Sequence, residues 1–169
     1  MQQSNNSNIH PALMQIKNNT IYWVGHLPND FNEHFAGQTF VSPKDGLIDN
    51  IQIYADLVQR PGDILLTFHS FDADHKKWGQ VLRSSTVSLE RKDSEKWIPF
   101  FLPDLPIQKE MVYGFRVHTA GALVGIGEAA GVIKNRPYTF GQEWKGSSAE
   151  DVGEYYSYFS LVFKIELRH

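Results

Sequence analysis

Apolar residues recur at every second position through much of this chain, and no long segment shows the spacing of an amphipathic helix. Three segments carry the pattern most clearly: 47–58, 111–118 and 159–168. Because successive side chains of a strand point to opposite faces, each predicts a strand with one buried and one wet face. In the first segment the residues expected to point inward are Leu47, Ile51, Ile53, Ala55 and Leu57. Its wet face would carry Asn50, Gln52, Tyr54 and Asp56.

Weaker alternation elsewhere brings the set to about nine predicted strands. The further segments are 20–24, 35–41, 63–71, 81–89, 97–102 and 122–129. Turn residues separate them, as in Pro61-Gly62-Asp63. Short strands at this spacing favour an all-β fold, and we expect an antiparallel β-sandwich with a jelly-roll arrangement. One helical turn is predicted within 147–156, where Ser148 can cap it.

The length of 169 residues suits one compact domain. Residues 1–8 are Gln, Ser and Asn after the initial Met, and we expect a disordered tail there. Residues 9–169 are then a single β-sandwich domain. The sequence has no basic region followed by an apolar run, as a secretory signal would have. It also has no apolar run long enough to span a membrane. The cellular compartment is therefore not assigned from the sequence.

Charge and cysteine content exclude several function classes. The formal net charge is -3, and the 16 basic and 19 acidic residues are interspersed. The sequence therefore has no concentrated positive region of the kind that attracts nucleic acid. Nucleic acid is therefore not an expected partner. The chain has no cysteine, which rules out disulfides, thiolate catalysis and cysteine-ligated zinc.

The stretch HSFDADHKKWG, at 69–79, groups acidic and histidine side chains as a metal loop does. Asp72, Asp74 and His75 are weak metal candidates, with calcium or a transition metal as the ion. Lysines at 76 and 77 oppose a cation there, in positions where a calcium loop needs an oxygen ligand and glycine. A solvated hairpin loop between two strands is the favoured interpretation, and no cofactor is required.

Several aromatic residues lie outside the clear strand pattern and are candidates for ligand binding. An aromatic face can stack on a sugar ring while nearby polar groups bind its hydroxyls, although packing under long loops is the plainer alternative. Trp97 differs, because its segment is apolar on both faces and predicts a core position. The candidate ligand-binding residues are Trp78, Trp144, Tyr156, Tyr138 and Asp74.

Enzyme signatures are sparse. No nucleophile-elbow, zinc-protease or phosphate-loop motif is present, and Gly125 to Gly131 follows a strand pattern without opening a helix. Carboxylate pairs such as Glu128 with Glu143 can serve glycoside hydrolysis only if the fold brings them a few ångströms apart across a cleft. We therefore expect a protein that is not an enzyme.

The order of turn glycines and core aromatics resembles a known class of modules. Gly37-Gln-Thr-Phe40, Pro61-Gly62-Asp63, Tyr113-Gly-Phe115 and Tyr138-x-Phe140-Gly141 precede a terminal alternating strand. This layout is similar to that of jelly-roll β-sandwich modules of secreted and cell-surface bacterial proteins, including carbohydrate-binding modules. The resemblance implies non-catalytic binding or anchoring, a possible structural calcium, and an extracellular or cell-surface location.

Three functions remain open at this point. A non-catalytic module that binds carbohydrate, or acts in adhesion, is the preferred hypothesis. The second is a structural or assembly protein whose sheet edges and exposed aromatics bind a protein partner or a second copy. The third is a metal- or carboxylate-dependent enzyme on a jelly-roll fold.

Overall fold

The computed structural model describes residues 9–168, so the predicted tail at 1–8 lies outside the described residues. Thirteen strands, all paired antiparallel, make up the fold, with one 3-10 turn, η1 (Arg91–Asp93). The strands are β1 (Ile9–Gln15), β2 (Thr20–His26), β3 (Glu33–Val41), β4 (Gly46–Arg60), β5 (Gly62–Asp72), β6 (Lys77–Leu89), β7 (Lys96–Ile107), β8 (Val112–His118), β9 (Leu123–Ala130), β10 (Glu143–Ser147), β11 (Glu150–Tyr156), β12 (Phe159–Leu161) and β13 (Phe163–Arg168).

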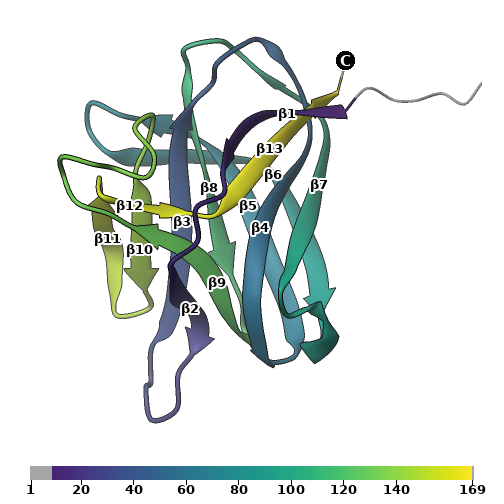
Figure 1. Ribbon diagram of the computed structural model, residues 1–169, viewed down its shortest axis with the longest axis vertical. Helices are drawn as coiled ribbons and strands as arrows, with labels where there is room; N and C mark the ends of the chain where they lie inside the picture. The colour runs from purple at the N-terminus through teal and green to yellow at the C-terminus, as the bar shows by residue number, and fades with distance from the viewer. Residues whose placement is uncertain (1–8, 169) are drawn as a thin grey trace, which may run out of the picture.

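The strands form one sheet that curls into a half-barrel around the core (Figure 1). Its path of hydrogen-bonded neighbours is β1-β13-β4-β9-β2-β3-β8-β5-β6, and β7 pairs with β4 off this path. The β10–β11 hairpin attaches to β3 through β10, and β12 attaches to β9. The large side chains inside the curl are fully buried, among them Phe40, Phe68, Phe100, Phe115 and Phe163.

The all-β, antiparallel prediction is confirmed, and each of the nine predicted segments overlaps a strand, with only residues 111, 122 and 162 falling outside. The expected number of strands was too low, because β1, β10 and β11 were missed and 159–168 divides into β12 and β13. The helical turn predicted within 147–156 is wrong. That segment forms the turn of the β10–β11 hairpin and strand β11. No helix long and apolar enough to cross a membrane occurs in residues 9–168.

Two bulges change which residues of β4 point inward. Ile51, Ile53 and Ala55 are buried as expected, but Leu47 and Leu57 are 40% and 44% exposed. The pairing register shifts between Ile48 and Asn50 on one side and between Ala55 and Leu57 on the other. An extra residue at a bulge moves the following side chains to the opposite face. Ile48 and Val58 therefore fill the core in their place.

Candidate functional site

The stretch 69–79 is the tip of the β5–β6 hairpin, as the loop interpretation predicts. Asp72 pairs with Lys77 across the strands, and the turn lies between them. The carboxylate of Asp72 accepts hydrogen bonds from the backbone N–H groups of His75 and Asp74, each at 3.1 Å. The backbone hydrogen bond from His75 lowers the pKa of Asp72 most, and the hydrogen bond from the His75 ring lowers it further. Asp72 and His75 thus satisfy each other, and Asp74 is exposed.

Metal-ligating side chains do not converge in threes anywhere in the part of the chain that the structure describes. Within the hairpin tip, the three weak candidates supply one carboxylate and one imidazole that already bind each other at 2.9 Å, plus the exposed Asp74.

Trp78 and Trp144 do come together, but in a closed arrangement. Their ring centroids are 5.6 Å apart, and the guanidinium of Arg116 lies 4.4 Å from the Trp78 ring and 4.2 Å from the Trp144 ring. Trp144 is only 2% exposed, and its indole N–H donates to the carbonyl of Val152 at 3.0 Å. Its ring is therefore not available for stacking on a sugar.

Glycines make the burial of Trp144 possible. A Cβ on Gly146 would lie 2.3 Å from the Trp144 ring, and one on Gly153 would lie 2.5 Å from its indole nitrogen. Gly153 also has a φ of +67°, which favours glycine. The β10–β11 hairpin can therefore fold tightly over the indole.

The other predicted ligand-binding aromatics lie apart from this cluster. Tyr138 is 8% exposed and packs edge-on against Phe163, with centroids 5.4 Å apart. The hydroxyl of Tyr156 donates to the Glu154 carboxylate at 2.6 Å, and the ring is half-buried. The five predicted ligand-binding residues therefore do not form one open surface.

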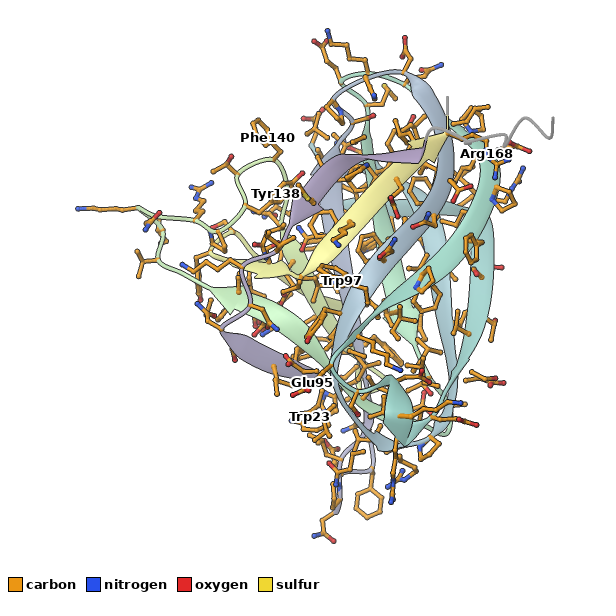
Figure 2. All side chains as sticks on the ribbon, turned by 45° about the vertical axis from the view of Figure 1, so that its right-hand side comes forward. Trp23, Glu95, Trp97, Tyr138, Phe140 and Arg168 are labelled. Atoms are coloured by element: carbon orange, nitrogen blue, oxygen red, sulfur yellow. The ribbon has the colours of Figure 1, made fainter. Side chains whose placement is uncertain are left out.

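The expectation that Trp97 belongs to the core is wrong. Ile98, Phe100 and Leu102 fill the interior side of β7, which leaves Trp97 half-exposed on the outer side and Phe101 60% exposed. A strand that is apolar on both faces gives no signal of which face is buried. Figure 2 shows Trp97 on the side of the molecule where β4, β7 and β13 run together, away from Tyr138 and Phe140.

Trp97 pairs across the strands with Tyr54 of β4, and their ring centroids are 5.5 Å apart in an edge-to-face contact. The ammonium of Lys164, on β13, lies 3.9 Å from the Trp97 ring centroid. These three residues line a groove of about 430 Å³. Its other lining residues are Met14, Ile16, Asn18 and Val162.

Hydrogen-bonding groups surround this aromatic pair. Gln52, one step along β4 from Tyr54 on the same face, donates to the carboxylate of Glu166, and Asn18 donates to Asp56 at 3.2 Å. Lys164 pairs with Gln52 in the strand register. We call the outer surface formed by Tyr54, Trp97, Lys164, Gln52 and Glu166 the outer platform. Sequence alternation did place Tyr54 and Gln52 on a wet face, so a tyrosine among polar residues was the available signal.

A second group of functional side chains lies inside the curled sheet. The structure brings Glu128 of β9 and Glu143 of β10 to the same ammonium, that of Lys145, at 2.9 Å and 3.5 Å. Both carboxylates are almost fully buried, at 3% and 0% exposed. Burial, followed by the neighbouring Glu128, raises the pKa of Glu143 well above its usual value. These carboxylates share one lysine and do not flank an open cleft.

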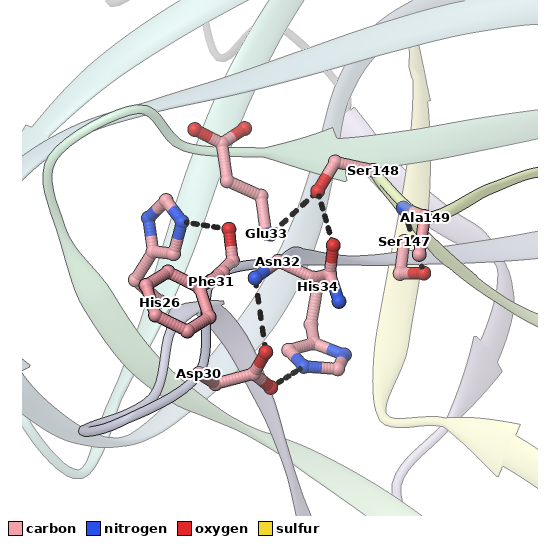
Figure 3. A network of polar contacts seen from close by, with 9 residues as sticks. All are labelled: His26, Asp30, Phe31, Asn32, Glu33, His34, Ser147, Ser148 and Ala149. Carbon is pink, nitrogen blue, oxygen red and sulfur yellow. Dashed lines mark hydrogen bonds and ion pairs between the residues drawn. The ribbon is translucent and has the colours of Figure 1, made fainter.

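A cavity of about 300 Å³ borders Lys145, and Tyr22 of β2 and His34 of β3, the strands that the β2–β3 loop connects, also line it. Figure 3 shows this loop tied to the β10–β11 turn. The hydroxyl of Ser148 accepts from the backbone N–H of Glu33 at 2.9 Å, and the ring of His34 lies 2.5 Å from the Asp30 carboxylate. The loop and the hairpin are therefore held as one unit beside the cavity.

No protein-family model matches this chain, and no curated protein matches it significantly. The candidate functional residues form two groups, the outer platform and the buried group around Lys145.

Proposed function

We propose that this protein is a non-catalytic binding module whose ligand is a carbohydrate held on the outer platform. The observation that carries the proposal is the pair of half-exposed rings, Tyr54 and Trp97, set edge to face beside a groove of about 430 Å³. Aromatic surface gives a sugar ring an apolar face to stack on, and adjacent polar groups orient its hydroxyls. Gln52, Glu166 and Lys164 supply such groups.

The platform is built on strands. Tyr54 comes from β4, which pairs both with β13, the strand of Lys164, and with β7, the strand of Trp97. Side chains on paired strands need little ordering when a ligand binds, so less of the interaction energy is lost. A jelly-roll arrangement of the curled sheet, a cell-surface location and a structural calcium ion remain predictions that go with this function.

The proposal is tested by screening soluble glycans for thermal stabilisation and then titrating any glycan that binds. Ligands that bind only the folded state raise its apparent stability by mass action. Trp97→Ala is expected to weaken binding by about tenfold or more. Phe140→Ala is the matched control, because Phe140 is 64% exposed on a different loop and its loss should leave affinity unchanged. Equal affinity of the Trp97 variant and the native protein would remove the platform as the site.

A protein partner or a second copy is the next candidate. Met14 and Ile16, at the edge of the same groove, are 53% and 59% exposed, which gives an apolar surface that a protein could cover. Sedimentation of the native chain at micromolar concentration separates the two proposals. A dimer that Met14→Ser dissociates would favour assembly, whereas a monomer that binds glycan favours the carbohydrate module.

A further inference from the structure

The ion pair between Lys145 and Glu128 differs from the exposed pair between Lys92 and Glu90 in its surroundings. The ammonium nitrogen lies 2.9 Å from Oε2 of Glu128, whose side chain is only 4% exposed. Aromatic rings enclose the same ammonium, with centroids at 4.3 Å for Phe159, 4.7 Å for Tyr22 and 5.1 Å for Tyr156. An amine and a carboxyl group are thus held in contact, with the carboxyl group almost fully buried and the lysine side chain 21% exposed.

The carboxylate oxygens around Lys145 are held by charge more than by directed hydrogen bonds. Within residues 9–168, Oε2 of Glu128 contacts the ammonium, yet neither it nor either oxygen of Glu143 accepts a well-directed hydrogen bond. Removing two charges from water is costly, and their attraction compensates only when the remaining polar atoms are also bonded. A reaction that eliminates both charges would therefore be favoured in this setting.

Glu143 is placed to move protons for such a reaction. Its carboxylate lies 3.5 Å from the Lys145 nitrogen and is fully buried. Burial and the adjacent Glu128 raise its pKa, while Lys145 lowers it less. A buried carboxyl group with a raised pKa, next to an amine and an acceptor carbonyl, can act as general acid and then as general base.

We infer that Lys145 and Glu128 are joined by a covalent amide bond formed within the folded chain. The ammonium of Lys145 gives a proton to the Glu128 carboxylate, and the free amine attacks Cδ of Glu128. Glu143 protonates the carbonyl oxygen and takes back a proton from the attacking nitrogen. The bond from Cδ to one oxygen breaks, and that oxygen leaves as water. An ammonium and a carboxylate become an amide plus water, and Glu143 is unchanged.

The bond needs no oxidant, metal or other reactant, because proximity replaces activation. Groups held in contact in the correct orientation react as though at very high concentration. The cavity of about 300 Å³ beside Lys145 gives the released water a way out.

The position of the bond fits a structural role. In the described residues β9 pairs with β2, β4 and β12, and β10 pairs with β3 and β11, so no ladder joins β9 to β10. A Lys145–Glu128 amide would join β9 to β10 directly, in addition to the ladder that attaches the β10–β11 hairpin to β3. This chain has no cysteine, so a disulfide cannot serve that purpose. The inference does not depend on carbohydrate binding.

Mass spectrometry of the intact native protein tests the inference. We expect the mass to be one water below that of the sequence, and peptide mapping to give one species in which the peptides with Glu128 and Lys145 are joined. Lys145→Met and Glu128→Met, which keep the length of each side chain, should both show the full mass. Glu143→Gln should lower the joined fraction while leaving both partners in place.

Lys92 and Glu90 provide the matched control. Their charged atoms are 3.1 Å apart, nearly the separation of the buried pair, but their side chains are 75% and 65% exposed. Lys92→Met should therefore leave the loss of water unchanged. A native protein that keeps its full mass after prolonged incubation in the folded state overturns the inference, and so does a joined peptide that contains Glu143 in place of Glu128.

Discussion

The Trp78–Trp144 pair and the Tyr54–Trp97 pair are built from similar parts and differ in what covers them. Each places a cation against an indole ring, Arg116 in the first pair and Lys164 in the second. The β10–β11 hairpin folds over the Trp144 ring, which is 2% exposed, while Trp78 is half-buried. The second lies on the outer face of β4 and β7 beside a groove. Covering strands, and not ring type, decide which aromatic pair can meet a ligand.

The largest expected effect that separates the pairs concerns stability. Trp144→Ala should reduce the free energy of unfolding by about 3–5 kcal/mol, because it removes a large buried ring. Trp97→Ala should cost about 1 kcal/mol or less, since its ring is half-exposed. Denaturant unfolding of both variants measures the difference. Equal losses of unfolding free energy in the two variants would contradict the difference in burial between Trp144 and Trp97.

The closing hairpin itself can be tested through its glycine. Gly146→Ala should destabilise the protein by about 1–3 kcal/mol, because the new methyl group overlaps the Trp144 ring. Gly121→Ala is the matched control, since a Cβ there has no neighbour within 4 Å. Thermal unfolding of the two variants gives the comparison, and a Gly146 variant as stable as the Gly121 variant would contradict the tight fit.

The pH dependence of the free energy of unfolding should show how strongly burial of His118 excludes water from the sheet face beside the Trp78–Trp144 pair. Burial, with smaller contributions from Arg116 and His69, lowers the pKa of His118 from 6.5 to about 4. The unfolded chain therefore binds a proton more readily than the folded one, and stability is lost as pH falls from about 6.5 towards 4. His69 contributes in the same direction, because burial lowers its pKa too.

The control for this prediction is His118→Phe, which keeps a ring against Phe35, whose centroid lies 4.6 Å from the imidazole. Urea unfolding at several pH values between 4 and 7 should show a shallower decline in this variant. An unchanged decline would assign the pH dependence to other groups.

The smallest effect concerns the cation on the open pair. Lys164→Met keeps most of the side-chain length over Trp97 and removes the charge, so glycan affinity should change by about fivefold or less. Isothermal titration with a glycan found in the screen measures this. A loss as large as that of Trp97→Ala would show that charge, and not ring stacking, dominates recognition.

The sequence predicted the strands well because alternation depends on local spacing alone. Bulges, as at Leu47 and Leu57, are set by pairing with β7, β13 and β9 and leave no such signal. Trp97 was misassigned because its strand is apolar on both faces, and Trp144 because its burial depends on the fold of a hairpin. Glu128 and Glu143 could be named as a pair, but only the tertiary fold reveals that Lys145 lies between them.

The most direct test of the central claim uses the four tryptophan indole N–H signals of the protein. A two-dimensional NMR titration with a glycan that stabilises the native chain follows all of them at once. We expect the Trp97 signal to shift with the ligand while the signal of the buried Trp144 stays in place. Shifts at Trp78 and Trp144 with an unmoved Trp97 signal would contradict it.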